Sequence, residues 1–408
     1  MSRFLSLPVL FFLFLVEWYG LQAVRTALQP ETSGGRRLIM VVYVVVTVLA
    51  WGLGIWAIST RRVAHPSYKV YFIGLLLGLI AAKLVIVLPL LLEDVVRGGR
   101  FVARQLSGNS AGGEPISRSA FLSRVALLLG AVPLVALVWG IVRGGTDYQV
   151  KRRVLRFPNL PAAFEGFTLL QISDLHTGSF TSKEPLRRAV QLINKQKADL
   201  IFMTGDLVNN VATEVEEHID TLAGIRSERP IYSILGNHDY GDYVQWKSVE
   251  AKRANLERLM QNHAKIGWEL LMDESRVVEH KGEKIAILGV QNWGTKFVKH
   301  GNLAKAHATS GDAPFKILLT HDPTHWDAQV HDYQDIDLTL SGHTHGAQFG
   351  LNLPHLKWSP VQYVYKQWAG LYQRGKQQLY VNVGLGFLGY PGRVGFLPEI
   401  TVFELRRA

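Results

Sequence analysis

Five short motifs rich in histidine and aspartate constrain the fold of this chain more than any other feature. They are Asp174-Leu175-His176, Gly205-Asp206, Gly236-Asn237-His238-Asp239, His321-Asp322 and Gly342-His343-Thr344-His345. Each motif follows a short apolar run of β-strand character, and these runs span residues 168–172, 200–203, 231–235, 317–319 and 338–340. Because strand ends deliver side chains to a shared cleft, we predict one metal centre assembled from distant parts of the chain.

The residue types in these motifs suit divalent transition metals, and there are too many of them for one ion. Carboxylate oxygens and imidazole nitrogens favour Mn, Fe, Zn, Co or Ni. Two ions roughly 3.5–4 Å apart are the usual arrangement for hydrolysing phosphate esters. We therefore predict a dinuclear centre whose candidate ligands are Asp174, His176, Asp206, Asn237, His321, His343 and His345.

The alternative is that these histidines are ordinary surface or core residues. The chain has 14 histidines, so any single one could be structural. The occurrence of all five motifs, in order and each after a strand, argues jointly against that alternative. The spacing of His343 and His345 fits a strand end or a loop, because one face of a helix needs residues four apart.

In these motifs the chain resembles the calcineurin-like metallophosphoesterases, whose pattern is Asp-x-His, Gly-Asp, Gly-Asn-His-(Asp/Glu), His and Gly-His-x-His. All five blocks fall within residues 168–348. The Gly-His-Thr-His-Gly block and the Pro-Glu-Ile-Thr run at 398–401 look most like the membrane-associated bacterial branch of YkuE-like and YaeI-like proteins. The resemblance implies an α/β fold, a four-layer α-β-β-α sandwich of two mixed sheets flanked by helices.

The resemblance also implies a role for each motif residue. Asp174, His176 and His345 would bind the first metal ion, and Asn237, His321 and His343 the second, with Asp206 bridging both. His238 would stand near the leaving-group oxygen as a proton donor or charge stabiliser, oriented by Asp239. The chain departs from the family pattern at Asn209, often Asp, and at Ala347, often Gly, which puts metal preference and the shape of the substrate loop in doubt.

The pattern of apolar residues independently predicts the same fold. Short β-branched-rich strands are expected at residues 167–172, 199–204, 231–235, 284–290, 315–320, 336–341, 378–383 and 399–404. Helices are expected at 185–197, at 213–226 after a Thr213-x-x-Glu216 capping box, and at 246–267.

The first 148 residues have a different composition from the rest. Residues 4–24, 38–58, 70–92 and 121–142 are apolar stretches near the ~20 residues that a helix needs to cross a bilayer. We therefore predict a four-helix transmembrane region at 1–148 and a phosphoesterase domain at 149–408. Glu17 and Lys83 lie inside two of the spans; they either face the bundle interior or snorkel, or they form a paired or headgroup-binding site.

Charge and cysteine content narrow the choice of partners. The net charge of +11 suggests nucleic acid at first, but the basic residues gather beside the spans and in short groups. Affinity for anionic lipid headgroups explains this distribution better, so we expect a lipid bilayer and no nucleic acid as partner. The absence of cysteine excludes disulfides without indicating a compartment.

The distribution of basic residues also bears on orientation. Beside the spans, Arg3, Arg61, Arg62 and Lys69 share the side of the C-terminal domain, and Arg25, Arg36, Arg37, Arg97, Arg100, Arg104, Arg118 and Arg124 lie opposite. Because cytoplasmic loops are enriched in basic residues, this favours a domain on the extracytoplasmic face of a bacterial plasma membrane. Counting the basic residues of 143–156 removes the difference, although 149–156 has the character of a strand. Residues 117–122 also resemble a twin-arginine signal that lacks its second arginine.

Three further residues are candidate substrate contacts. Trp358 and Trp368 lie in an apolar segment directly after the last motif. They either pack a local hydrophobic cluster or form an apolar lip that dips into the membrane interface. Arg393, in a Gly-rich turn, is either a surface residue or a guanidinium that holds a second phosphate or a headgroup.

These observations predict a membrane-anchored, dinuclear-metal phosphoesterase. Its substrate would contain a phosphodiester, phosphomonoester or pyrophosphate bond, and membrane anchoring favours a lipid-linked molecule. A nucleotide or cyclic-nucleotide phosphodiesterase is the second hypothesis. A membrane scaffold that binds metal without catalysis is the third, and the intact ligand set argues against it.

Overall fold

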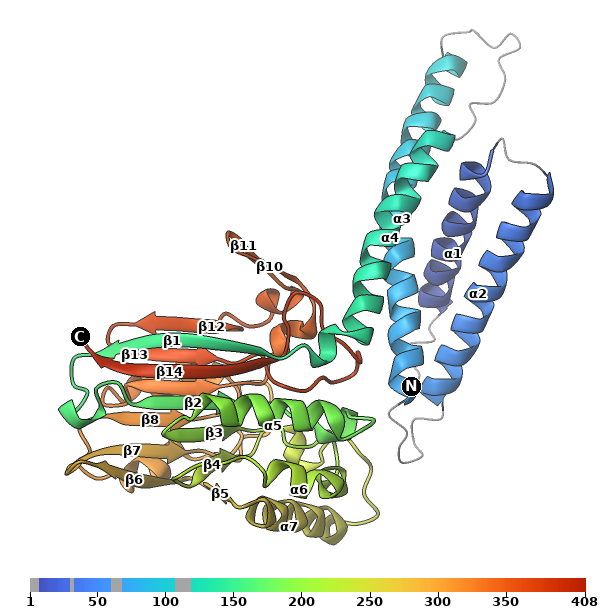
Figure 1. Cartoon of the computed structure of the whole chain (residues 1–408). Coiled ribbons are helices and arrows are strands. Elements are labelled where there is room, and N and C mark those ends of the chain that lie inside the picture. Colours follow the sequence, from blue (N-terminus) through green and yellow to red (C-terminus); the bar gives the residue numbers. More distant parts are fainter. Residues whose placement is uncertain (1–6, 30–32, 60–67, 107–118) are drawn as a thin grey trace. The chain divides into compact units, whose positions relative to one another are not determined.

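The computed structural model describes residues 7–29, 33–59, 68–106 and 119–408. It divides the chain into two compact units, Met1–Ile141 and Val142–Ala408. Figure 1 draws both units.

The first unit contains four long apolar helices. These are α1 (Leu7–Ala27), α2 (Ser33–Ser59), α3 (Tyr68–Leu106) and α4 (Ala120–Val142). All four are long and apolar enough to cross a membrane, which confirms the four predicted spans. The third is longer than predicted, because the predicted span ends at residue 92 whereas residues 93–106 continue the helix. This basic segment contains Gly98 and Gly99 but no proline, so no residue in it removes a backbone hydrogen bond. Residues 107–118 lie outside the described residues.

The two charged residues of the spans pair with each other. Lys83 is only 4% exposed, and its Nζ lies 2.5 Å from Glu17 Oε2 and 3.1 Å from Thr47 Oγ1. The indole of Trp51 donates to the other oxygen of Glu17 at 2.9 Å. Glu17 and Lys83 therefore face the interior of the bundle, and pairing offsets a cost of about 3 kcal/mol for each charge in hydrocarbon.

The second unit is built on two six-stranded sheets (Figure 1). The first has the order β1 (Gln149–Phe157), β14 (Glu399–Arg407), β2 (Thr168–Ile172), β3 (Leu200–Thr204), β4 (Ile231–Ile234) and β5 (Trp268–Leu270). The second has the order β12 (Gly370–Arg374), β13 (Gln377–Val381), β9 (Leu338–Ser341), β8 (Lys316–Leu319), β7 (Glu283–Gly289) and β6 (Glu274–His280). Both sheets mix parallel and antiparallel pairs, and each of the eight predicted strands is present. Short strands β5, β6 and β12 were not predicted.

Three hydrophobic clusters make the unit a four-layer sandwich. Between the sheets, aromatic residues such as Phe157, Phe202 and Phe403 are buried with aliphatic residues of both sheets. Helices α5 (Glu184–Gln196), α6 (Ile219–Leu222) and α7 (Val249–Ile266) cover the outer face of the first sheet. Helices α8 (Leu303–Ala308) and α9 (Thr324–Ala328) pack on the second. Because both faces of each sheet are covered, the central strands β2, β3, β4, β8 and β9 are fully or almost fully buried and mostly apolar, and the predicted fold is confirmed.

One predicted helix is wrong in type. Residues 213–226 were expected to form a single helix after a capping box, but the chain forms a 3-10 helix at Ala212–His218 followed by the single turn of α6. No side chain caps this segment. The Glu216 carboxylate instead accepts both guanidinium bonds of Arg258, at 2.5 and 2.7 Å, so it does not complete the box with Thr213.

Candidate metal centre

The five motifs meet at one edge of the sandwich. Asp174 and His176 follow β2, Asp206 follows β3, and Asn237 follows β4, all in the first sheet. His321 follows β8, and His343 and His345 follow β9, in the second sheet. These strands run parallel within each sheet, so their carboxyl ends share an edge.

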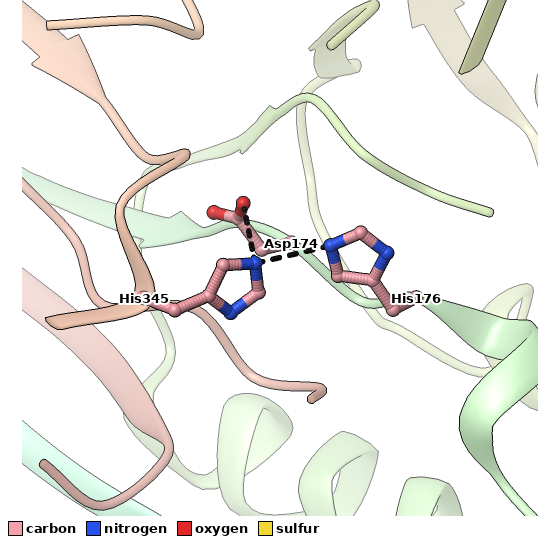
Figure 2. Close-up of side chains that lie close together, drawn as sticks. All are labelled: Asp174, His176 and His345. Atoms are coloured by element: carbon pink, nitrogen blue, oxygen red, sulfur yellow. Dashed lines mark hydrogen bonds and ion pairs between the residues drawn. The ribbon is translucent and has the colours of Figure 1, made fainter. Parts of the chain in front are cut away.

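Asp174, His176 and His345 form the first cluster of candidate ligands. One nitrogen or oxygen atom of each lies within 4.8 Å of the others, and all three side chains are buried. The Nε2 atom of His345 is 3.1 Å from Nε2 of His176 and 3.3 Å from Oδ1 of Asp174 (Figure 2). Ligands about 2.0–2.1 Å from a tetrahedral ion lie about 3.3 Å apart, so the spacing fits one ion.

Asp206, His321 and His343 form the second cluster, again within 4.8 Å. Asp206 lies between the two clusters, because its Oδ2 is 3.1 Å from His321 Nε2 and 3.6 Å from His176 Nε2. Its other oxygen accepts the backbone N–H of His238 at 2.8 Å. A carboxylate in this position can serve two ions at once.

Several buried atoms in the centre lack a hydrogen-bond partner within the described part of the chain. They include Asn237 Oδ1 and His343 Nδ1. The Asn237 amide nitrogen is meanwhile held by Tyr243 Oη at 2.8 Å, which leaves the amide oxygen free. Buried polar atoms are normally satisfied, so these atoms are the expected second-ion ligands and support the fit of the site to two ions.

The backbone at the centre is strained. Asp174, His176, Asp206, His343 and His345 all have φ between 47° and 75°. This left-handed conformation costs on the order of 1–3 kcal/mol for each residue with a side chain, and it clusters at functional sites. Ala347, at a position where the family often has glycine, shares it with φ of 53°.

The electrostatics of the centre favour a bound cation. Burial lowers the pKa of His176 to about 3 and of His343 to about 4, so both imidazoles are neutral and free to act as ligands. Burial and the nearby Asp206 carboxylate raise the pKa of Asp174 to about 6. Burial alone would lower the pKa of His321, but Asp206 and Asp174 raise it to about 10. The carboxylates thus attract positive charge to the place where the ions are expected.

Ligand orientation comes from the turns that follow the strands. The Thr204 carbonyl lies 2.7 Å from His321 Nδ1, which directs Nε2 of that ring to Asp206. Gly205 has φ of 91°, and a Cβ there would lie 2.7 Å from both Gly236 N and His321 Nδ1. The glycine of the Gly-Asp motif is therefore required by close packing against the neighbouring motifs.

His238 is held differently from the expectation. Its Nδ1 lies 2.6 Å from the backbone carbonyl of Asn209 rather than near Asp239, and its ring packs edge-on against His176 at 5.0 Å. Asn209 contributes its backbone carbonyl to His238, and its side-chain amide donates to Ser179 Oγ at 2.9 Å.

The expected role of Asp239 is wrong. Its buried carboxylate accepts four backbone N–H groups, from Gly236, Asp206, Leu207 and Val208, at 2.8–3.2 Å. No bond to the His238 ring is among these contacts. Asp239 is therefore a positioning residue that ties the Asp206 turn to the Asn237 turn.

The expected substrate role of Arg393 is also wrong. The side chain is 0% exposed. Its five N–H donors make five hydrogen bonds to four acceptors, which are the carbonyls of Gly386 (which accepts two), His345 and Phe396, and Nδ1 of His345. A guanidinium with every donor used inside the protein has none left for a phosphate. Arg393 instead fixes the ring of His345 so that Nε2 faces Asp174 and His176.

Of the two tryptophans, Trp368 does not form an apolar lip. It is 7% exposed and packs against Phe396, with ring centroids 5.2 Å apart. Trp358 is half-buried, and its Nε1 donates to Tyr363 Oη at 3.3 Å. The first interpretation, a local hydrophobic cluster, therefore holds for Trp368.

Two tyrosines beside the centre were missed by the sequence analysis. Tyr365 Oη lies 2.8 Å from His343 Nε2. The ring of Tyr243 stacks on His238 at 4.3 Å, while its hydroxyl holds Asn237. Tyr243 follows its motif by only a few residues, but no periodicity distinguishes either tyrosine from an ordinary loop aromatic.

Comparison with known proteins agrees with this geometry. Residues 167–347 match the family model described as calcineurin-like phosphoesterase. Residues 2–145 match a second model, described as probable calcineurin-like phosphoesterase, transmembrane domain.

Three relatives cover much of the chain. The uncharacterized metallophosphoesterase YkuE of Bacillus subtilis is 31% identical over 71% of this chain and 98% of its own length. A transmembrane protein with metallophosphoesterase domain from Danio rerio is 26% identical over 75% of this chain and 68% of its own. The phosphodiesterase YaeI of Escherichia coli is 26% identical over 63% of this chain and 87% of its own. With its clustered ligands and its four apolar helices, the chain belongs to the calcineurin-like metallophosphoesterases, a family of metal-dependent phosphoric ester hydrolases, and is a membrane protein.

Proposed function

We propose that this protein is a membrane-anchored hydrolase with two metal ions that cleaves a phosphodiester, phosphomonoester or pyrophosphate bond. The observation that carries the proposal is the position of Asp206 between two buried ligand clusters. Two divalent ions, drawn from Mn, Fe, Zn, Co and Ni, fit the mixed oxygen and nitrogen donors.

Each residue has a proposed role in this arrangement. Asp174, His176 and His345 would hold one ion, Asn237, His321 and His343 would hold the other, and Asp206 lies where its carboxylate could serve both. Bound ions would make a water molecule more acidic and would neutralise the phosphate oxygens as they gain charge. Arg393 and Asp239 keep the ligands in place through the hydrogen bonds described above.

His238 is the proposed proton donor to the leaving group. The Asn209 carbonyl occupies Nδ1, so Nε2 is the nitrogen left to face a substrate. The ring is half-buried, which gives a bound ester access to it. In its protonated form, His238 can pass the Nε2 proton to the departing oxygen as the phosphorus–oxygen bond breaks.

A lipid-linked phosphoester is the proposed substrate class. The four apolar helices tether the site to a bilayer, whose lipids and lipid-linked sugars carry phosphoesters. A soluble nucleotide or cyclic nucleotide is the second candidate, because the same chemistry cleaves it. A scaffold without catalysis is disfavoured, since buried and strained ligands are costly to retain without use.

The direct test is hydrolysis of bis(p-nitrophenyl) phosphate by the full chain in detergent. Activity should disappear after EDTA treatment and return when Mn²⁺ is added back, because the ligands need ions to bind substrate. A folded protein that binds two ions but hydrolyses neither this ester nor a cyclic nucleotide would support the scaffold alternative.

We further propose that the catalytic unit lies on the extracytoplasmic face of a bacterial plasma membrane. The support is the distribution of basic residues beside the spans, of which Arg3, Arg61, Arg62 and Arg118 lie outside the described residues. The chain has no cysteine, so an exposed position such as Val277, 48% accessible on β6, can carry the only thiol. A membrane-impermeant maleimide should label Val277→Cys in spheroplasts with an intact inner membrane; labelling only after lysis would place the unit in the cytoplasm.

A further inference from the structure

A small β-hairpin projects from the catalytic unit (Figure 1). It consists of β10 (Leu351–Leu353) and β11 (Leu356–Trp358), and residues 351–357 are all exposed. In its antiparallel register Leu351 faces Trp358 and Leu353 faces Leu356, whereas Asn352 faces Lys357. Because side chains alternate between the faces of a strand, one face of the hairpin carries only Leu351, Leu353, Leu356 and Trp358.

This apolar face has no covering within the described residues of the catalytic unit. Leu351, Leu353 and Leu356 are 49%, 57% and 50% exposed. Tyr363 and Val364, which follow the hairpin, are 76% and 53% exposed. An isolated two-stranded hairpin is marginally stable in water, and contiguous exposed apolar residues mark an interaction surface.

The base of the hairpin and the segment that directly follows the last span contact the same loop. Helix α4 ends at Val142, and the buried Gly145 packs on the loop 387–392, where an added Cβ would lie 3.3 Å from Gly392 Cα. The same loop is bonded to Gln348, whose Nε2 donates to the carbonyls of Tyr390 and Gly392 at 2.8 and 3.1 Å. Gln348 is three residues before the hairpin, so the hairpin base and the membrane exit share one anchoring loop.

This connection favours the bilayer as the occupant of the apolar face. Only Arg143 and Gly144 separate the end of α4 from Gly145, which contacts that loop, and each extended residue spans at most about 3.6 Å. Leucine and aromatic side chains suit the boundary between headgroups and acyl chains. Lys366, eight residues after Trp358, pairs with Asp327 at 3.9 Å, but its side chain is 85% exposed and can attract anionic headgroups.

The hairpin is also continuous with the candidate metal centre. It is inserted between His345 and Tyr365, and Tyr365 Oη lies 2.8 Å from His343 Nε2. Directly after β11, Ser359 Oγ donates to the Gly346 carbonyl at 2.8 Å, which fixes the hairpin to the loop of the last motif. A lipid reached by the hairpin face would therefore be at the margin of the ligand clusters.

We propose that the apolar face of the β10–β11 hairpin lies in the interfacial layer of the bilayer that anchors the chain, and that it brings phosphoesters of lipids to the metal centre. The second half of this statement rests on the proposed function. The first half concerns membrane contact alone and can be tested without activity.

Membrane contact can be measured by placing a nitroxide label on Leu353→Cys in the full chain, reconstituted in phosphatidylcholine–phosphatidylglycerol nanodiscs. The matched control is Val277→Cys on β6, which is 48% exposed and lies at the edge of its sheet opposite β12. We expect oxygen to accelerate the spin relaxation of the label at 353 more than a water-soluble nickel complex does. The label at 277 should respond more strongly to the nickel complex. Equal access of nickel to both labels would overturn the proposal, as would a label at 353 that neither reagent reaches, since a protein would then cover it.

The substrate half is tested by Leu351→Ser, Leu353→Ser and Leu356→Ser combined in one chain. Turnover of a phospholipid analogue in vesicles should fall about tenfold or more, because interfacial binding scales with the apolar area buried. Turnover of bis(p-nitrophenyl) phosphate should not change, and Val277→Ser should leave both rates unchanged. An equal loss of turnover on both substrates would show that the hairpin does not bring lipid phosphoesters to the metal centre. Failure of the wild-type protein on both would reject the proposed function but leave the label measurement valid.

Discussion

Replacing Asp206 with asparagine should lower turnover by roughly 100-fold or more, because a bridging ligand and its charge are lost. The substitution keeps the size of the side chain, and its amide oxygen can still accept the His238 N–H. It removes the negative charge that lies 3.1 Å from His321 and 3.6 Å from His176. We expect the metal content to fall from two ions towards one, measured by mass spectrometry alongside kcat/KM for bis(p-nitrophenyl) phosphate.

A matched control for this substitution is Asp337→Asn. Asp337 is equally buried, at 1% exposed, but it precedes β9, whereas His343 follows the other end of that strand. Its carboxylate accepts the backbone N–H of Lys316 at 2.9 Å, so the control reports the loss of a structural carboxylate. The control should lower the melting temperature and keep both ions. Near-normal turnover in purified Asp206→Asn with two ions bound would remove the proposed mechanism.

Replacing His238 with alanine should also reduce turnover by roughly 100-fold or more, the usual contribution of a positioned acid catalyst. The reduction should be larger for an alkyl ester than for a p-nitrophenyl ester, because an alkoxide needs the proton more than nitrophenolate does. The measurement is kcat for the two leaving groups in wild-type and variant protein. No ion is lost in this variant, since His238 is not among the proposed ligands.

His307→Ala serves as the control for removal of an imidazole. The ring of His307 binds the Asp335 carboxylate at 2.9 Å on α8, outside the metal centre, so kcat should be unchanged. If His238→Ala slows both leaving groups by the same factor, His238 positions the substrate and does not transfer the proton. Retention of full activity would assign the proton to solvent.

Much of the site could be predicted because its signals are local. Each motif directly follows a strand, and the strands β2, β3, β4, β8 and β9 are short apolar runs that periodicity detects. The ends of parallel strands meet at one edge, so residues as far apart as Asp174 and His345 could be expected together. The four membrane spans could also be predicted, because about twenty apolar residues in succession are rare outside membrane-spanning helices.

The sequence-based predictions were wrong where a side chain has more than one possible hydrogen-bond partner. The family resemblance suggested Asp239 as a partner for His238, but four backbone amides donate to its carboxylate. Glu216 had the spacing of a capping box, yet Arg258 from α7 takes its carboxylate. The spacing of residues in the sequence indicates the possible hydrogen-bond partners, and only the packing of distant segments determines which of them is bound.

The sequence by itself determined the fold family, the membrane anchor, the candidate ligands and their order along the chain. The tertiary structure alone decided that Arg393 faces inward, that Trp368 is buried, and that Tyr365 reaches His343. It alone showed five candidate ligands in the left-handed conformation. The reason is physical: periodicity and motif spacing depend on neighbours in the chain. The direction of a buried guanidinium depends on acceptors from other turns, such as the His345 carbonyl 48 residues before Arg393. The conformation of a ligand turn depends on contacts with the other sheet, such as the bond from the His343 N–H to Asp174.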